Sequence, residues 1–211
     1  MAGDGRLKIR NALISVSDKS SLEDLVTFLD QNNVSIFSTG GTAKFIESFG
    51  INVKQVSEIT NFPEIMDGRV KTLNPLIYGG ILNRSGIDDH IQKEHGMINL
   101  DLMVINLYPF EETISENNVS ELDAIENIDI GGPSMIRASA KNFYNKAILT
   151  DPDDYLSFIN ELQNNDCSIS EEKRRNLALK AFKRTAMYDS CLLYTSPSPR
   201  DQRGSRMPSS A

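Results

Sequence analysis

The chain has 211 residues, of which 39% are hydrophobic and 24% charged, and its formal net charge is −7 at pH 7. This size and composition are typical of one large globular domain. The acidic balance argues against nucleic acid or an anionic membrane as a partner. No apolar run approaches the roughly 18 residues that a membrane span needs, and the amino-terminal stretch lacks the apolar core of a signal peptide.

Cysteine and histidine usage indicates a cytoplasmic protein without a metal site. Cys167 and Cys191 form no disulfide framework and have no metal-ligand spacing, so a reducing compartment is expected. His90 and His95 lie in a polar stretch, where we expect them to face solvent. Neither histidine pairs with a carboxylate or a cysteine at the spacing of a zinc site.

Short apolar runs predict five strands, and amphipathic stretches between them predict helices. The predicted strands are 12–17, 34–38, 52–56, 102–107 and 146–150. The predicted helices are 22–29, 43–49, 120–126, 133–141, 151–162 and 170–188. Strands that alternate with helices indicate an α/β fold, here a three-layer αβα arrangement with a mainly parallel sheet.

Local signals refine these elements. Ser20 and Glu23 have the spacing of a capping box ahead of the first helix. Three helices carry residues at helical spacing that should face the core. They are Leu22, Leu25, Val26 and Leu29; Tyr155, Phe158, Ile159 and Leu162; and Ala178, Ala181, Phe182 and Thr185.

Two segments do not follow the strand–helix pattern. Residues 61–83 form a long irregular piece, and a loop of this length is typically functional. From Ser196 the chain is polar and contains three prolines, which is typical of disorder. We therefore expect one domain over 1–190 and a disordered, non-native tail over 191–211.

Polar residues follow three of the predicted strands, and ligands of open parallel sheets bind beyond the carboxyl ends of the strands. The glycine pair after the second strand exposes backbone N–H groups that suit phosphate, although the spacing is not that of a P-loop. Each segment taken alone is nearly as well explained by an ordinary turn. The residues concerned are Ser17, Asp18 and Lys19; Thr39, Gly40, Gly41 and Thr42; and Asn106 and Tyr108.

The stretch Asn127–Asn142 gathers several groups that could bind or react. The two glycines of Gly131–Pro133 allow a tight turn, and the proline suits the first position of a helix. Asp129 precedes this turn, near the positive end of the helix dipole. Arg137 and Lys141 are four residues apart and share one helix face. The alternative is an ordinary helix with solvated charges. From the residues alone we infer an α/β protein that binds a small phosphorylated anion.

Five motifs occur in the order in which a known family has them. They are Ser15–Lys19 (SVSDK), Ser38–Lys44 (STGGTAK), Phe62–Leu73 (FPEIMDGRVKTL), Asn106–Phe110 (NLYPF) and Glu126–Pro133 (ENIDIGGP). With these motifs the chain, from about Asn11 to Ser190, resembles the IMP cyclohydrolase domain. That domain is the N-terminal half of the bifunctional enzyme of purine biosynthesis, AICAR transformylase/IMP cyclohydrolase. The stretches LALKAF at 177–182 and TAMYD at 185–189 extend the resemblance.

The resemblance implies a fold like that of methylglyoxal synthase and one reaction. In this reaction 5-formamidoimidazole-4-carboxamide ribotide loses water and becomes IMP. The resemblance implies no cofactor and no metal for this step, whereas 10-formyltetrahydrofolate serves the transformylase half, which is absent here. It also implies a nucleotide as the small-molecule partner and a homodimer as the form of the family's protein.

The resemblance further implies roles for individual residues. Lys141 falls on the family's proton-transfer lysine and Tyr108 on a tyrosine beside the reacting groups. We assign Lys71 and the backbone near Asp129 to the charge that develops on the formyl oxygen, and Asp129 to a shared proton relay. The substrate contacts implied are Ser17, Asp18, Lys19, Thr39, Gly40, Gly41, Thr42, Arg69, Val70, Thr72, Ile105, Asn106 and Ile130.

The chain differs from the family pattern at three positions, and two other functions are possible on the same fold. Asn74, Tyr78 and Arg184 occupy positions at which the family commonly has histidine, so a histidine that orients the substrate is not expected. An allosteric nucleotide-sensing module, as in carbamoyl phosphate synthetase, and methylglyoxal synthase itself share the phosphate loops. Neither rival explains the presence of both Arg69–Lys71 and Asn106–Tyr108.

Overall fold

The main sheet has five parallel strands in the order β4-β3-β2-β5-β6, and β1 and β7 pair in a small antiparallel ribbon. The computed structural model describes residues 5–66, 70–107 and 125–195. Most of the predicted helix 120–126 lies outside these ranges. The strands are β1 Leu7–Lys8, β2 Asn11–Ser15, β3 Ser35–Ser38, β4 Val53–Gln55, β5 Leu102–Ile105, β6 Ala147–Leu149 and β7 Ser168–Ile169.

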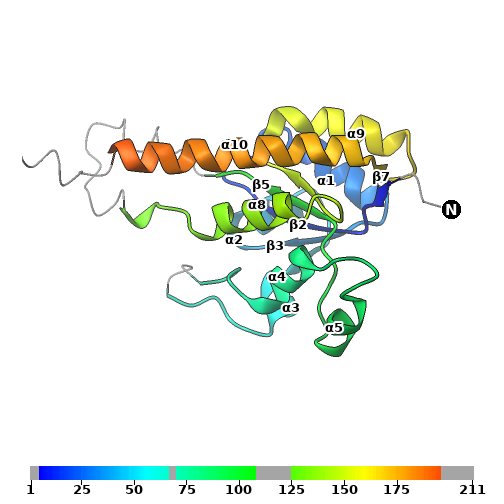
Figure 1. The fold of residues 1–211 in the computed structure, drawn as a ribbon, viewed down its shortest axis with the longest axis horizontal. Helices are drawn as coiled ribbons and strands as arrows, with labels where there is room; N and C mark the ends of the chain where they lie inside the picture. Colours follow the sequence, from blue (N-terminus) through cyan, green and yellow to red (C-terminus); the bar gives the residue numbers. More distant parts are fainter. Residues whose placement is uncertain (1–4, 67–69, 108–124, 196–211) are drawn as a thin grey trace, which may run out of the picture.

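Helices cover both faces of the sheet (Figure 1), which confirms the predicted three-layer α/β fold. Ala12 and Ile14 of β2 belong to the core shared with α1, α2 and α9. Leu13, between them, belongs to the core shared with α3, α4, α8 and α10, because alternate side chains of a strand point to opposite faces. The helices are α1 Leu22–Gln31, α2 Gly40–Glu47, α3 Val56–Thr60, α4 Pro75–Leu82, α5 Asp89–Glu94, α8 Gly131–Lys141, α9 Tyr155–Gln163 and α10 Glu171–Thr195, with a 3-10 turn η1 at Pro152–Asp154.

The predicted core faces of α1 and α9 are confirmed, since all eight residues named for them are buried. On α10 Ala178, Ala181 and Thr185 are buried as well. The prediction for Phe182 is wrong, because 39% of this residue is exposed. Its ring lies at the edge of the helix that borders α8, where the Arg137 guanidinium sits 6.0 Å from the ring centroid.

Two helices begin earlier than predicted, and α1 begins at Leu22 as predicted but without the predicted cap. The capping box is wrong because the Asp18 carboxylate accepts the backbone N–H of Ser20, and α1 begins only after Ser21, which has a left-handed φ of 56°. Helix α2 begins at Gly40, so the glycine pair is its first turn. Helix α8 begins at Gly131, and Pro133 still lies among the first four residues, whose N–H groups have no partner within a helix.

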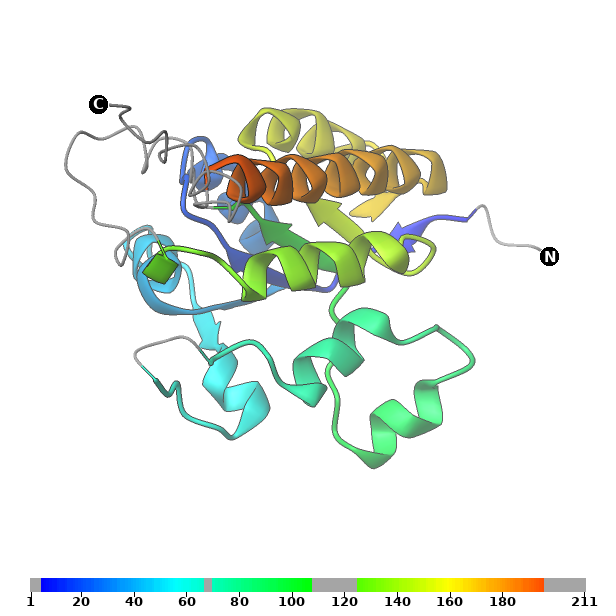
Figure 2. The same ribbon diagram turned by 60° about the vertical axis from the view of Figure 1, so that its left-hand side comes forward.

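Residues 61–83 are not a continuous irregular piece. Helix α4 occupies Pro75–Leu82, with Asn74 as its N-cap: the Asn74 Oδ1 accepts the Leu76 N–H at 2.9 Å. The short helix α3 ends just before Asn61. With α5, these helices form the lower part of the molecule in Figure 2. Mean hydropathy alone does not distinguish the short apolar helix α4 from a buried strand or loop.

The carboxyl-terminal helix is longer than predicted. Helix α10 continues to Thr195, so residues 191–195 are helical and the expected disordered tail does not begin at Cys191. Cys191 and Leu192 are partly buried against the core shared with α8. None of the helices in the described ranges combines the length and the apolar composition of a membrane span.

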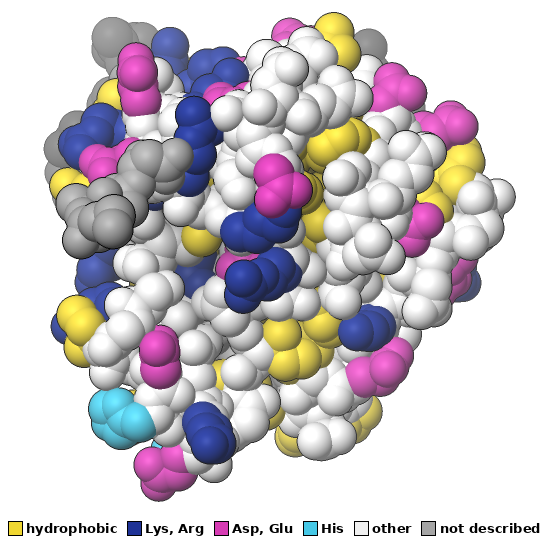
Figure 3. All heavy atoms as spheres, turned by 90° about the vertical axis from the view of Figure 1, so that its right-hand side faces the viewer, with side chains coloured by type: hydrophobic (Ala, Val, Ile, Leu, Met, Phe, Trp, Pro, Cys, Tyr) yellow, Lys and Arg dark blue, Asp and Glu magenta, His cyan; other side chains and the backbone are white. Residues whose placement is uncertain are grey.

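The amino ends of the strands are joined by a buried polar network. The Lys146 ammonium, just before β6, is fully buried and donates to Asn83 at 2.6 Å and to Asn99. Asn99 in turn donates to Asp101, whose carboxylate also accepts the backbone N–H of Arg10 at 2.9 Å. On the outside, the side of the molecule near the amino terminus carries interspersed acidic and basic side chains (Figure 3).

Candidate active site

The two central strands β2 and β5 are neighbours, and the chain leaves them in opposite directions, so their carboxyl ends form a topological switch point. Here the Asn106 Oδ1 accepts the backbone N–H of Ser17 at 2.7 Å, and the Asn106 amide donates to the Asp18 carbonyl at 2.7 Å. The Ser17 hydroxyl donates to the Leu107 carbonyl at 3.2 Å. The structure therefore joins the first and fourth predicted strand ends, as expected from the sequence.

A tyrosine that the sequence predicts only as a core residue supports this junction from below. Tyr155, at the start of α9, is 1% exposed, and its hydroxyl lies close to Asn106. Burial raises the pKa of Tyr155 above its ordinary value, and the negative charges of Asp18 and Asp151 raise it further. Tyr155 therefore places a buried, neutral hydroxyl near Asn106, the side chain that holds Ser17 and Asp18.

The start of α2 lies next to this junction. The Thr42 hydroxyl accepts the Val16 N–H at 3.2 Å and donates to the Val16 carbonyl at 3.0 Å, which ties α2 to the end of β2. Gly40 and Gly41 are exposed, and no atom lies within 4 Å of where their Cβ atoms would be. Lys19 lies on the same side, with its ammonium 5.9 Å from the Phe45 ring of α2. The exposed backbone N–H groups at the start of α2 therefore lie near the Lys19 cation.

Asp129 lies just before the first turn of α8, and its carboxyl group contacts that turn. The Asp129 Oδ1 accepts the Gly132 N–H at 2.8 Å, and the carboxylate lies so close that a Cβ on Gly132 would stand 2.2 Å from it. The same Cβ position is 2.8 Å from Leu107, so this turn adjoins the end of β5. Burial raises the pKa of Asp129, although Gly132, the positive charge of Lys71 and the Gly131 N–H oppose the shift.

Lys71 and Thr72 approach the same turn from another segment. The buried Thr72 hydroxyl lies 2.9 Å from the Cβ position of Gly131, and Lys71 is exposed and attracts Asp129. Val70 forms a bridge with Ile65, in which the Ile65 N–H donates to the Val70 carbonyl at 3.2 Å. A pocket of 210 Å³ lies beside Lys71 and is lined by Phe62, Ile65, Val70, Lys71, Leu73 and Asn74.

Tyr78, one of the three departures from the family pattern, also contacts α8. Its hydroxyl bonds to the Ser134 hydroxyl at 2.7 Å. Burial raises the pKa of Tyr78, and the negative charge of Asp129 raises it further, against the opposing hydrogen bond with Ser134. Tyr78 therefore lies in the field of Asp129. The sequence gives its position in the family pattern but not this contact.

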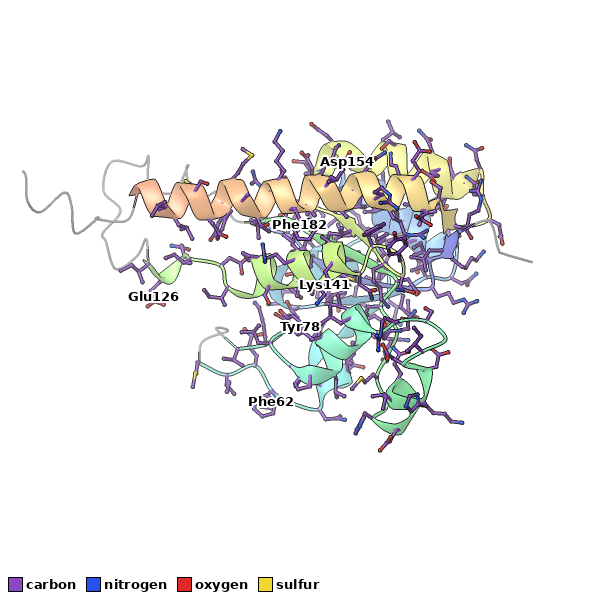
Figure 4. All side chains as sticks on the ribbon, in the orientation of Figure 1. Phe62, Tyr78, Glu126, Lys141, Asp154 and Phe182 are labelled. Atoms are coloured by element: carbon purple, nitrogen blue, oxygen red, sulfur yellow. The ribbon has the colours of Figure 1, made fainter. Side chains whose placement is uncertain are left out.

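The structure does not bring Lys141 to Asp129. Lys141 ends α8, whereas Asp129 precedes its first residue, and ten residues at 1.5 Å per residue separate the two ends of this helix by about 15 Å. A lysine side chain spans less than half of that distance. Figure 4 shows Lys141 at the end of α8 remote from Glu126. Lys141 shares an exposed face with Arg137, as predicted.

Of the remaining predicted site residues, two are described by the structure and two are not. Ile105 is buried at the end of β5, and Ile130, which precedes α8, is 63% exposed. Arg69 and Tyr108 lie outside the described residues. Within the described part of the chain, no group of histidine, cysteine, aspartate and glutamate side chains could hold a metal ion. The site that the structure brings together thus comprises the Ser17–Asn106 junction, the start of α2 and the start of α8 with Lys71.

Two family models match the chain in adjoining parts. The model described as MGS-like domain matches residues 21–134. The model described as AICARFT/IMPCHase bienzyme matches residues 139–206. The first match spans more than half of the chain and includes the Thr39–Thr42 loop and Asp129.

Relatives and a solved structure extend this similarity. Proteins named bifunctional purine biosynthesis protein PurH from Xanthomonas euvesicatoria pv. vesicatoria (strain 85-10) and Xanthomonas oryzae pv. oryzae (strain PXO99A) are 51% identical over 186 residues. The match covers 88% of this chain but only 35% of each relative, so the chain spans about a third of their length. The crystal structure of ForH superposes with a TM-score of 0.80 at 32% identity, covering 87% of this chain and 95% of that one.

Proposed function

Since this chain belongs to the MGS-like domain family, we propose that it is an IMP cyclohydrolase. In this proposal it closes the second ring of the purine by removing water from 5-formamidoimidazole-4-carboxamide ribotide. The bifunctional name of the PurH relatives supports a role in purine biosynthesis, and a cytoplasmic location is part of the proposal. The transformylase activity that the resemblance implies, its folate cofactor and a homodimeric state are proposals for the longer protein.

One observation carries the proposal: at the start of α8 the half-buried carboxyl group of Asp129 lies within the electrostatic reach of Lys71, beside two loops suited to a phosphate. Leu107 links these parts, because its carbonyl accepts the Ser17 hydroxyl and its side chain touches the turn at Gly132. Asp129 and Lys71 attract each other at that turn. A nucleotide bound with its phosphate at Lys19 and Gly40 would extend from there toward Asp129.

Binding must first hold the two reacting groups in attack geometry. Both lie on one substrate, so the task is to rotate the carboxamide toward the formyl carbon and keep it there. We assign the 5′-phosphate to Lys19 and the first turn of α2, where backbone N–H groups and the helix dipole favour an anion. Asn106 fixes the Ser17 loop against which the ribose would lie.

Ring closure then moves two protons to one oxygen. The carboxamide nitrogen attacks the formyl carbon, a C–N bond forms, and negative charge develops on the formyl oxygen beside the Lys71 cation. Asp129 carries one proton from the carboxamide nitrogen and then one from the formamido nitrogen to that oxygen. The C–O bond breaks, a C=N bond forms, and water leaves. A carboxyl group with a raised pKa exchanges protons more readily near neutral pH.

An experiment distinguishes the roles of Lys71 and Lys141. The proton-transfer role of Lys141 stays a prediction, since it requires a substrate that lies along α8. We expect Lys71→Ala to lower kcat more than Lys141→Ala, because Lys71 lies next to Asp129 and Lys141 does not. Lys93→Ala, on the exposed helix α5, is the control for loss of a lysine. A larger loss in Lys141→Ala would contradict our assignment and move the proton transfer to Lys141.

The phosphate assignment predicts a binding effect at Lys19. Lys19→Ala should weaken IMP binding by about tenfold or more, since a hydrogen bond to a charged group contributes roughly 1.5–3 kcal/mol. Inosine, which lacks the phosphate, should bind equally to both proteins. Titration calorimetry measures all four affinities. Unchanged IMP affinity in Lys19→Ala would remove Lys19 from the phosphate site.

Two substrates test the proposal against its rivals. The protein is incubated with the formamido ribotide, and purine absorbance is followed. A parallel incubation with dihydroxyacetone phosphate measures release of phosphate and methylglyoxal. The proposal predicts turnover of the ribotide alone. Turnover of dihydroxyacetone phosphate would favour methylglyoxal synthase, and nucleotide binding without turnover would favour a sensing module.

A further inference from the structure

Tyr188 of α10 contacts the backbone of Asp129, which is 59 residues away in the sequence. Its hydroxyl oxygen accepts the Asp129 N–H at 2.8 Å. Tyr188 is 6% exposed and continues the buried face of α10 that contains Ala181 and Thr185. The resemblance includes Tyr188 in the stretch TAMYD, but the mechanism above gives it no role.

Asp129 is held by neighbours from two helices. The next residue, Ile130, is 63% exposed, so its side chain does not anchor this turn in the core. The Asp129 carboxylate is held by the Gly132 N–H from within α8. Its backbone is held by Tyr188 from α10. Hydrogen bonds from two different helices therefore hold Asp129: those of the Gly132 and Gly131 N–H groups at the start of α8, and that of Tyr188 from α10.

We propose that Tyr188 is a positioning residue that holds the Asp129 carboxyl group in its reactive orientation. The inference rests on the proposed function, because it concerns the group that moves protons there. Tyr188 touches the backbone of Asp129, and through this hydrogen bond it acts on the carboxyl group. Without the hydroxyl, the Asp129 N–H loses its acceptor and the turn relaxes toward solvent.

The surroundings of Asp129 make this relaxation measurable. Among the described residues, the titratable groups that face Asp129 are Lys71, Tyr78 and Tyr188. Burial is the main cause of the raised pKa of Asp129. A carboxyl group that moves toward solvent loses this cause, so its pKa should fall toward the ordinary aspartate range.

The test compares Tyr188→Phe with Thr185→Val in the full chain. Phe keeps the ring packing and removes only the hydroxyl. Thr185→Val removes a buried hydroxyl one turn earlier on the same face, where it donates to the Phe182 carbonyl within α10. Two quantities are measured: kcat and KM for the formamido ribotide, and the titration of the Asp129 carboxyl carbon by NMR, assigned with Asp129→Asn. Melting temperatures report the packing of both variants.

Tyr188→Phe should lower kcat about tenfold with little change in KM, because a small displacement of a reacting group slows the chemical step. Its Asp129 titration should move to lower pH, whereas Thr185→Val should leave that titration in place. An unchanged Asp129 titration in Tyr188→Phe, with or without a loss of rate, would overturn the inference. Failure of the proposed function has a different signature: the wild-type protein would not convert the ribotide, whatever the titration of Asp129 shows.

Discussion

Asp129→Asn should lower kcat for ring closure by about 10²–10⁴-fold, the contribution typical of a positioned acid–base group. Asparagine has almost the same shape and can still accept the Gly132 N–H, so the turn at the start of α8 is kept. It cannot carry a proton between nitrogen and oxygen. The affinity for IMP should therefore change little while kcat and kcat/KM fall together.

The control for this variant is Asp24→Asn. Asp24 is an exposed carboxylate in the first turn of α1, so its replacement tests the loss of an acidic group at a helix start without touching the site. We expect its kinetics to match the wild-type protein. Asp129→Asn with an unchanged kcat and a raised KM would show that Asp129 binds the substrate but moves no proton.

Lys146→Met should destabilise the fold by about 3 kcal/mol, the scale for removing one partner from a buried charged network. It leaves the oxygens of Asn83 and Asn99 without their donor and takes away the cation near the buried Asp101 carboxylate. For a chain of this size the melting temperature should fall by on the order of 10 °C. Urea unfolding measures the free energy directly.

The pH dependence gives this prediction a second readout. Burial lowers the pKa of Lys146 to about 8, below the value of roughly 10.4 expected in the unfolded chain. Between these values the unfolded state binds more protons, so the wild-type protein should gain stability relative to Lys146→Met as the pH rises from about 8. Lys93→Met, which changes an exposed lysine, should show neither effect. A loss of stability at Lys146 similar to that at Lys93 would contradict the account.

Much of the fold could be predicted because its sheet is built from simple patterns. Runs such as 102–105 are apolar throughout, as expected for strands covered on both faces. The period of α1 places Leu22, Leu25, Val26 and Leu29 on one buried face. These patterns are local, and the α/β class follows from their alternation.

Other parts could not be predicted because distant residues decide them. Helix α4 carries apolar residues on several sides, so it has little helical period to detect, and its Asn74 cap replaces a family histidine. Phe182 has the spacing of a core residue, but it lies at the border with α8. Helix α10 extends past Cys191 because Cys191 and Leu192 pack against the core, which composition does not reveal.

In the candidate site, too, some features follow from local patterns and others depend on distant residues. We predicted that Ser17 and Asn106 lie together because ligands of parallel sheets bind at strand ends, and the hydrogen bond between them confirms this. This prediction depends only on the order of the strands. The resemblance implies one reaction for Lys141 and Asp129, and because about 15 Å of helix α8 separates them, their shared role stays a prediction that needs a substrate along the helix. The contact of Tyr188 with Asp129 joins two helices, and no local pattern indicates it.

The most direct test of the central claim is the rate of ring closure in a single turnover, measured against pH for the wild-type protein and Asp129→Asn. Asp129 must be ionised to take the first proton, and its pKa is raised by burial. The wild-type rate should therefore fall as the pH drops, with a midpoint above that of an ordinary aspartate, and this fall should be missing from the slow Asp129→Asn protein. The same acid limb in both proteins would show that another group carries the proton.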